Sequence, residues 1–306
     1  MVDLTVNLGR GITLKNPVMT ASGTFGYGEE FQMLYDLESL GGIVTKAITP
    51  EERPGNQIPR IAETECGMLN SIGLANVGLE RFLTEKVPSL QQLKTVIFVN
   101  VAGKELEHYV EVAARLNDIE CIHGIEVNIS CPNVKEGGIA FGADPAVAAA
   151  VTRAVRKVYS KHMMVKLTPN VTDMTTVARA VEAEGADSLS LINTLVGMAV
   201  DVQTRKPKVR SITAGYSGPG IKPVALACVY RCSQAVKIPV VGMGGIRNHK
   251  DVVEFLLAGA TAVQVGTANF TDPLAAQKIA DNLELYLLTQ KIESVQSLIG
   301  GMLTGV

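Results

Sequence analysis

Polar side chains stand at the ends of several short apolar runs in this sequence, at positions where buried strands would end. Asn100 in FVNV, Asn128 in EVNIS and Asn193 in LINT are of a residue type that is disfavoured in strands and costly to bury without partners. Lys46 in IVTKA and Lys166 in MVKLT follow the same pattern, and a buried ammonium requires an anion or several acceptors. One explanation is that each of the five residues finds its own hydrogen-bond partner in the core. Five such residues at corresponding strand ends instead favour a single polar ligand that binds beside all of them.

Two later apolar runs end in glycine-rich sequences, GMGGI and VQVGTANF. Small residues leave backbone N–H groups accessible to an anion, and the ends of the seventh and eighth strands are a common phosphate site in α/β barrels. The sequence therefore predicts a phosphate cradle at Gly244, Gly245, Gly266 and Thr267.

These residues require strands that bring their ends together, and the chain contains eight short apolar, β-branched runs. Turn signals and helical periodicity follow these runs, which is the pattern of βα units and a parallel sheet. The predicted strands are 17–21, 42–46, 96–101, 124–129, 163–168, 187–192, 238–243 and 261–266. Helical patterns cover 78–93, 104–117, 145–159, 173–185, 222–236, 249–259 and 272–290.

Eight βα units favour an α/β fold with a single (β/α)8 TIM barrel, and we expect residues 1–306 to form one domain. The alternative, an open doubly wound sheet, is disfavoured because the first strand is followed by ASGTFGYGEE rather than by GxGxxG. The longer non-helical stretches 47–77, 130–144 and 195–221 all follow strands, on the barrel face where active sites are built.

The composition narrows the class of partner. Hydrophobic residues make up 47% of the chain, the formal net charge is −2, and no basic stripe is present, so a nucleic-acid partner is not expected. Neither a signal sequence nor a membrane-length apolar run is visible, and we expect a cytoplasmic protein without a membrane partner.

The five cysteines lack a disulfide framework, and they are predicted to be free thiols. Cys228 and Cys232, four residues apart, are best interpreted as small core residues. The four histidines show no metal-ligand spacing, so we predict no metal site and no iron–sulfur cluster in this chain.

The segment NISCPNVKEGGIAFG (128–142) resembles the catalytic loop of the class 1 dihydroorotate dehydrogenases. Further blocks resemble that family in the same order along the chain: ASGTFGYG (21–28), TKAITPEERPGNQIPRI (45–61), GMLNSIGLANVG (67–78), VNVAG (99–103), VKLTPN (165–170), INT (192–194), GYSGPGIKP (215–223), GMGGI (242–246) and VGT (265–267). The resemblance extends over nearly the whole chain.

This resemblance implies an activity and its catalytic groups. The family oxidises (S)-dihydroorotate to orotate in de novo pyrimidine biosynthesis: a base takes a proton from C5 while C6 delivers a hydride to N5 of FMN. The residue that matches the family's cysteine base is Cys131, whose thiol needs a lowered pKa or well-placed partners to act at neutral pH. Lys46 resembles the family lysine that lies against flavin and substrate, where its charge would stabilise negative charge developing on the flavin.

The resemblance also implies two sets of binding residues. Amide side chains suit orotate because each one both donates and accepts. The implied substrate set is Lys46, Asn70, Ser71, Ile72, Gly73, Leu74, Asn128, Asn133, Asn193 and Thr194. The implied FMN set is Ser22, Lys46, Ala47, Asn100, Asn128, Lys166, Ile192 and Gly218, together with Gly244, Gly245, Gly266 and Thr267.

The resemblance is greatest to the class 1B enzymes, which use NAD. Class 2 members have an N-terminal extension and a serine base, whereas this chain begins almost at its first strand and has Cys131. Class 1A enzymes reduce fumarate and usually have a proline-rich continuation after SCPNV, whereas the loop here reads KEGGIAFG. Class 1B implies a homodimer core joined to an electron-transfer subunit that holds FAD and a [2Fe–2S] cluster, in a heterotetramer.

Three alternatives stay open at this point. The first is a fumarate-dependent class 1A enzyme, and the second is a related flavin barrel that acts on another dihydropyrimidine. The third is a non-enzymatic flavin-binding barrel, which is disfavoured because both Cys131 and Lys46 are present.

Overall fold

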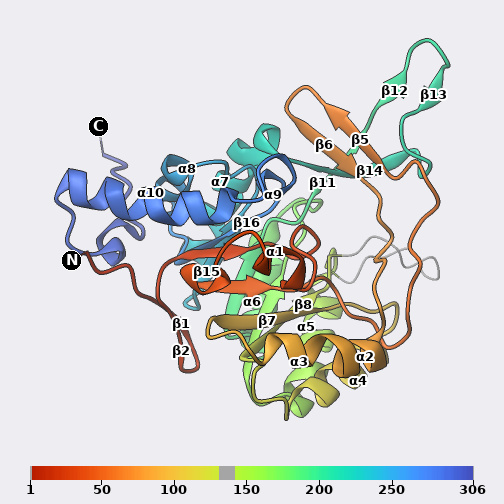
Figure 1. Cartoon of the computed structure of the whole chain (residues 1–306), viewed down its shortest axis with the longest axis horizontal. Coiled ribbons are helices and arrows are strands. Elements are labelled where there is room, and N and C mark those ends of the chain that lie inside the picture. Colours follow the sequence, from red (N-terminus) through yellow and green to blue (C-terminus); the bar gives the residue numbers. More distant parts are fainter. Residues whose placement is uncertain (1, 131–141, 306) are drawn as a thin grey trace.

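Eight parallel strands close into a barrel at the centre of the molecule (Figure 1). The computed structural model describes residues 2–130 and 142–305. In barrel order the strands are β10 (Ser188–Leu191), β15 (Val240–Met243), β16 (Ala262–Val265), β3 (Val18–Thr20), β4 (Gly42–Val44), β7 (Val96–Val101), β8 (Gly124–Asn128) and β9 (His162–Lys166). All eight predicted strands are therefore present, and the predicted (β/α)8 barrel is confirmed.

The barrel strands are buried on both faces, because helices cover the outside and side chains fill the inside. Every residue of β8, β9, β10, β15 and β16 is buried. This explains why these strands read as continuous apolar runs rather than as alternating patterns. It also makes each polar residue in their interior exceptional.

Helices follow the strands along the chain and form the outer layer (Figure 1). The longer ones are α4 (Leu106–Leu116), α5 (Pro145–Val158), α6 (Met174–Ala183), α7 (Lys222–Ala235), α8 (His249–Leu257) and α10 (Ala275–Gln290). Short α1 (Glu29–Gln32) follows β3, and α9 (Ala268–Thr271) follows β16. Side-chain caps fix where three helices begin: Asp144 caps α5, Asp173 caps α6, and Asn248 closes a capping box on α8.

The helical pattern predicted over 78–93 is interrupted. It divides into α2 (Leu79–Arg81), the π-helical turn η2 (Phe82–Lys86) and α3 (Val87–Leu90). Pro88, in the first turn of α3, has no N–H to donate to the preceding turn. A proline inside a helical run removes one ladder hydrogen bond, which accounts for a change of hydrogen-bond spacing at this point.

A second sheet, which the sequence did not predict, lies over one end of the barrel (Figure 1). It is antiparallel, with the order β11 (Leu195–Met198), β14 (Thr213–Ser217), β6 (Gly67–Asn70) and β5 (Ile61–Thr64). The ribbon β12 (Val200–Asp201) and β13 (Lys206–Pro207) extends beyond it. Two of the long stretches that follow barrel strands are thus partly built into this sheet.

The opposite end of the barrel is covered by an N-terminal hairpin, β1 (Val6–Gly9) and β2 (Ile12–Leu14). The carbonyl of Gly9 lies 3.3 Å from Nδ1 of His162, the first residue of β9. Short 3-10 turns η1 (Leu37–Ser39), η3 (Pro219–Ile221) and η4 (Val295–Leu298) complete the regular elements of the described residues. Within 2–130 and 142–305, no helix is both long and apolar enough to cross a membrane.

Candidate active site

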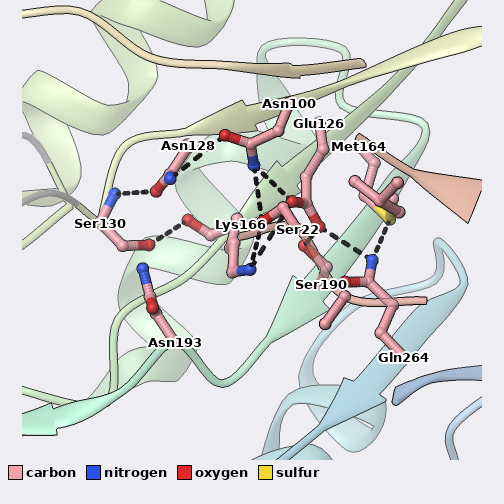
Figure 2. Close-up of polar contacts among 12 residues, drawn as sticks. Ser22, Asn100, Glu126, Asn128, Ser130, Met164, Lys166, Ser190, Asn193 and Gln264 are labelled. Carbon is pink, nitrogen blue, oxygen red and sulfur yellow. Dashed lines mark hydrogen bonds and ion pairs between the residues drawn. The ribbon is translucent and has the colours of Figure 1, made fainter. Parts of the chain in front are cut away.

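A buried polar network occupies the barrel interior close to the carboxyl ends of the strands (Figure 2). Glu126 of β8 is fully buried, and its Oε2 lies 3.6 Å from Nζ of Lys166 at the end of β9. The carboxylate also accepts from Asn100 Nδ2 at 2.5 Å, from Ser190 Oγ at 2.8 Å and from Gln264 Nε2 at 2.8 Å. The anion that a buried Lys166 was predicted to require is therefore present.

The network extends toward the carboxyl ends of the strands, to Ser22, which follows β3. Its Oγ accepts from Lys166 Nζ at 3.1 Å and from Asn100 Nδ2 at 3.2 Å. Three residues predicted to bind the cofactor are thus linked through Ser22, although they come from three separate strand ends. The structure brings them together as the strand pattern required.

Asn128 extends the same network along the end of β8. Its Nδ2 donates to Asn100 Oδ1 at 3.4 Å, and its Oδ1 accepts from the backbone N–H of Ser130 at 3.3 Å. The Ser130 hydroxyl in turn donates to the carbonyl of Lys166 at 2.7 Å. Figure 2 shows the Asn193 amide directed toward this cluster from the end of β10. Asn100, Asn128 and Lys166 are buried, and Asn193 is partly exposed.

Lys46 lies at the end of β4 with its side chain half-buried. Its backbone N–H donates to the Gly26 carbonyl at 2.7 Å, but its Nζ forms no hydrogen bond or ion pair with any residue that the structure describes. Burial and, second, the nearby Arg60 guanidinium lower the pKa of this ammonium below its usual value. The Glu30 carboxylate opposes this lowering only weakly, and it forms no ion pair with Lys46. A half-buried cation without a close counterion among the described residues is suited to an anionic or electron-rich ligand.

The antiparallel sheet positions part of the predicted substrate set. Asn70 of β6 pairs with Gly215 of β14, and its Nδ2 lies 3.4 Å from the Gly215 carbonyl. Thr194 lies against the same glycine, since a Cβ on Gly215 would be 2.2 Å from Thr194 Oγ1. Asn70 and Thr194, far apart in the sequence, are therefore neighbours through Gly215.

The loop after Asn70 has two positive φ angles, at Gly73 (+74°) and Leu74 (+57°). The Ile72 carbonyl accepts from the backbone N–H of Asn56 at 3.0 Å, which ties the loop to the preceding segment. The hydroxyl of Ser71 is buried and has no hydrogen-bond partner among the described residues. An unpaired buried hydroxyl is a group that a ligand could satisfy.

The residues predicted to cradle a phosphate come from three segments. Gly218, directly after β14, lies so close to Gly245 that a Cβ on Gly245 would be 3.0 Å from the Gly218 carbonyl. Gly244 and Gly245 have φ of +125° and +80°, which favour glycine. The backbone N–H groups of Gly218, Gly244, Gly245, Gly266 and Thr267 have no acceptor among the described residues. This concentration of unpaired donors suits an anion.

The remaining predicted positions contribute through the backbone or lie outside the described residues. Ala47 and Ile192 are buried at the ends of β4 and β10, and the Ile192 N–H donates to Met243 at 3.0 Å. Cys131 and Asn133 both lie outside the described residues, directly after Ser130. The roles predicted for these two residues stay predictions.

Sequence reasoning missed Glu126, Ser190 and Gln264. Each lies two positions before a predicted site residue at the end of its strand or directly after it: Glu126 before Asn128, Ser190 before Ile192 and Gln264 before Gly266. Alternate residues of a strand face the same side, so this spacing of polar residues within apolar strands was a usable signal.

The described cysteines Cys66, Cys121, Cys228 and Cys232 are free thiols, as predicted for them. Cys232 is fully buried, and Cys228 is partly buried against the core. Among residues 2–130 and 142–305, no group of three or more His, Cys, Asp or Glu side chains is placed to hold a metal ion.

Comparison with known proteins relates the whole chain to one enzyme family. The family model described as dihydroorotate dehydrogenase matches residues 4–287. A relative from Citrifermentans bemidjiense, named dihydroorotate dehydrogenase B (NAD(+)), catalytic subunit, is 56% identical over 300 residues, which are 98% of each chain. A relative of the same name from Phocaeicola vulgatus is 52% identical over 302 residues, 99% of each chain.

A solved structure shares the fold. The crystal structure of DHODH from Eimeria tenella in complex with ferulenol aligns with a TM-score of 0.79, and the alignment covers 98% of this chain and 88% of that one. The two sequences are 23% identical, so this similarity supports the barrel architecture alone.

Proposed function

The chain belongs to the dihydroorotate dehydrogenase family, and on this basis we propose that it is the catalytic subunit of an NAD-dependent dihydroorotate dehydrogenase. Its reaction is the oxidation of (S)-dihydroorotate to orotate in de novo pyrimidine biosynthesis. The observation that carries the proposal is the polar cluster at the barrel mouth, the end at which the carboxyl ends of the strands meet: Lys166 donates to Ser22 above a buried carboxylate, and Asn128 joins the cluster through Asn100. Such a set is complementary to the electron-rich edge of a flavin.

The residues of the mouth fit FMN. Lys166, Ser22 and Asn100 would hold the ring system from below, with Ala47 and Ile192 contributing backbone contacts. The unpaired N–H groups of Gly218, Gly244, Gly245, Gly266 and Thr267 would hold the phosphate. When bound there, FMN supplies the acceptor for the hydride that leaves C6 of dihydroorotate.

Protein side chains supply the rest of the chemistry. Cys131 is proposed as the base that removes the C5 proton, and Lys46 stabilises negative charge that develops beside it. Asn70, Asn128, Asn133, Asn193 and Thr194 would pair with the carboxylate, the carbonyls and the N–H groups of the substrate. The Ser71–Leu74 segment would close the pocket over it, with the unpaired Ser71 hydroxyl facing the ligand.

Electrons leave through a second subunit in this proposal. The relatives' name, catalytic subunit, implies another subunit in those proteins. For this chain we propose a homodimer core that binds subunits holding FAD and a [2Fe–2S] cluster, which pass electrons to NAD in the cytoplasm.

The test is anaerobic mixing of the purified chain with its ligands. We expect a flavin spectrum that bleaches with dihydroorotate and persists with dihydrouracil. Fumarate should not restore the oxidised spectrum rapidly, whereas the co-purified partner subunit should couple bleaching to NAD reduction. Absence of a flavin after reconstitution with FMN would contradict the proposal, and bleaching by dihydrouracil would instead favour a barrel acting on another dihydropyrimidine.

A further inference from the structure

Glu126 is the buried charge of the barrel interior that the proposed reaction does not use. Its side chain is fully inaccessible to solvent, and Lys166, Asn100, Ser190 and Gln264 surround it. Burial alone would raise the pKa of this carboxyl, but the Lys166 ammonium and the three hydrogen bonds outweigh it and lower the pKa. The Lys166 ammonium and the amide nitrogens of Asn100 and Gln264 can only donate, so the carboxyl that they surround is assigned its ionised form.

An ionised carboxylate can only accept, and this fixes the direction of the neighbouring hydrogen bonds. Asn100 must turn its NH2 group toward Glu126, which leaves Asn100 Oδ1 to accept from Asn128. Asn128 Oδ1 then accepts from the Ser130 backbone. Two site amides are thus oriented by one buried charge.

The same direction is imposed on Ser22. Its Oγ accepts from both Lys166 and Asn100, so its own hydroxyl proton is left to point elsewhere. The Ser22 hydroxyl and the Lys166 ammonium, which meet at the carboxyl ends of the strands, are both donors. Reduction of a flavin adds negative charge to its ring, so a floor of donors favours the reduced form.

The ion pair has a polarity along the barrel axis. In the β8–β9 register Lys166 is level with Asn128 at the strand ends, whereas Glu126 is level with Met164, one layer deeper. The ammonium donates to Ser22 beyond the end of β3, whereas the carboxylate accepts from Ser190 and Gln264 within β10 and β16, so the ammonium lies nearer to the mouth. The carboxylate offsets part of the ammonium's field at the mouth, because charges interact strongly in a buried, poorly screened environment.

We propose that Glu126 is a positioning residue that holds Lys166 beneath the bound FMN and, by pairing with its ammonium, limits the positive charge presented to the flavin; this charge effect outweighs its orientation of the neighbouring amides. This inference rests on the proposed function. Its consequence is a flavin whose reduction potential is held low, so that electrons can pass onward to the partner subunit.

The test is a redox titration of FMN bound to Glu126→Gln, with a reference dye and saturating FMN. The variant keeps the shape of the side chain and removes its charge. We expect the ratio of reduced to oxidised flavin at a fixed potential to rise at least tenfold, which is about 30 mV for a two-electron couple. A potential that is unchanged, or more negative, would overturn the proposal.

Two controls separate charge from packing. Ser190→Ala removes one hydrogen bond to the carboxylate and keeps the charge of Glu126. Its ratio of reduced to oxidised flavin at the same fixed potential should therefore stay within threefold of the wild-type ratio. Glu63→Gln removes an exposed carboxylate on β5 and should leave the potential unchanged. A shift in Ser190→Ala as large as that in Glu126→Gln would mean that packing alone sets the potential, and would also count against the proposal.

Glu126→Gln leaves the Lys166 ammonium buried without a counterion, which is destabilising and could prevent folding. A second pair of variants tests the same proposal in that case. Lys166→Met and the double variant Glu126→Gln/Lys166→Met differ only in the Glu126 charge. We expect the double variant to have the more positive flavin potential, so that its ratio of reduced to oxidised flavin at a fixed potential is at least tenfold higher. Equal potentials would refute the proposed effect of the Glu126 charge. If the wild-type chain binds no FMN, the proposed function fails, and that outcome is distinct from any of these.

Discussion

The Thr267 hydroxyl donates to Ser217 Oγ at 2.9 Å and thereby joins the end of the last barrel strand to the end of β14. Ser217 precedes Gly218, and the Gly218 carbonyl lies against Gly245 at the end of β15. Three chain segments therefore converge on one small region of unpaired backbone donors. The proposed phosphate site therefore draws on the antiparallel sheet as well as on the barrel.

Gly266→Ala should weaken FMN binding without weakening the fold. A Cβ at this position would meet Ala21 Cβ at 3.4 Å and Thr24 side-chain atoms at 3.8 Å and beyond, which is ordinary contact. We expect the free energy of unfolding of the FMN-free chain to change by less than about 0.5 kcal/mol. FMN affinity should fall at least tenfold, measured by flavin fluorescence, because the methyl group would occupy space proposed for the ligand.

Gly245→Ala is the contrasting variant for this prediction. Its φ is +80°, and the added Cβ would lie 2.8 Å from Lys222 Cβ, so the FMN-free chain should lose roughly 1–3 kcal/mol of stability. Wild-type FMN affinity in Gly266→Ala would show that the phosphate lies elsewhere.

Cys131→Ala should separate cofactor binding from proton removal. The variant should keep its flavin spectrum, but reduction by dihydroorotate at neutral pH should slow by a factor on the order of 10² or more, because no group replaces the base. Stopped-flow absorbance measures the rate. The matched control is Cys121→Ala, a thiol that precedes β8 at the other end of the barrel and should have no effect. Near-normal reduction in Cys131→Ala would remove this residue as the base.

The barrel could be predicted because its signal is local. Each strand is a short apolar run, and the polar residues at the strand ends mark one face of the barrel. Lys166 illustrates how far this reasoning extends: the sequence indicates that its ammonium needs an anion, but it does not name Glu126. That pairing depends on the β8–β9 register and on the direction of two side chains inside the barrel.

The antiparallel sheet could not be predicted by the same reasoning. Asn70 and Gly215, which pair across β6 and β14, are 145 residues apart. β5 and β6 are four residues each and are only partly buried, so neither shows the apolar run of a barrel strand. Their stability comes from pairing with β14 rather than from a local pattern.

Lys46→Ala and Asn193→Ala should affect different kinetic parameters. Loss of the Lys46 ammonium should slow flavin reduction by a factor on the order of 10² even at saturating dihydroorotate, because the charge that it stabilises develops during the reaction. Asn193→Ala should chiefly raise the dihydroorotate concentration for half-saturation, by about tenfold for one lost hydrogen bond.

Stopped-flow reduction over a range of substrate concentrations distinguishes these two effects. Lys94→Ala, which removes an exposed lysine, serves as the control and should match wild type. A Lys46→Ala chain with a normal saturated rate and only weaker substrate binding would reduce the role of Lys46 to binding.

His162, at the end of the barrel that the N-terminal hairpin covers, should make the free energy of unfolding depend on pH. The ring is buried, with Nε2 2.8 Å from Ser188 Oγ, and burial lowers its pKa to about 4, against a weaker opposing effect of Asp187. The folded state therefore resists protonation, whereas the unfolded histidine takes up a proton near its ordinary pKa of about 6.5. Between these two values the unfolded state binds more protons, so stability falls as the pH falls.

From pH 7 to pH 5 this group should lower the free energy of unfolding by about 2 kcal/mol, which follows from the linkage between the two pKa values. Urea unfolding at both pH values measures the loss. His162→Gln has no imidazole to protonate at this position. Its free energy of unfolding should therefore fall by about 2 kcal/mol less than that of wild type between pH 7 and pH 5, even if its stability at pH 7 is lower. His108→Gln, on α4, controls for removal of an imidazole elsewhere and should keep the wild-type loss. Equal losses in wild type and His162→Gln would mean that the buried ring already carries a proton, or that it becomes accessible before the chain unfolds.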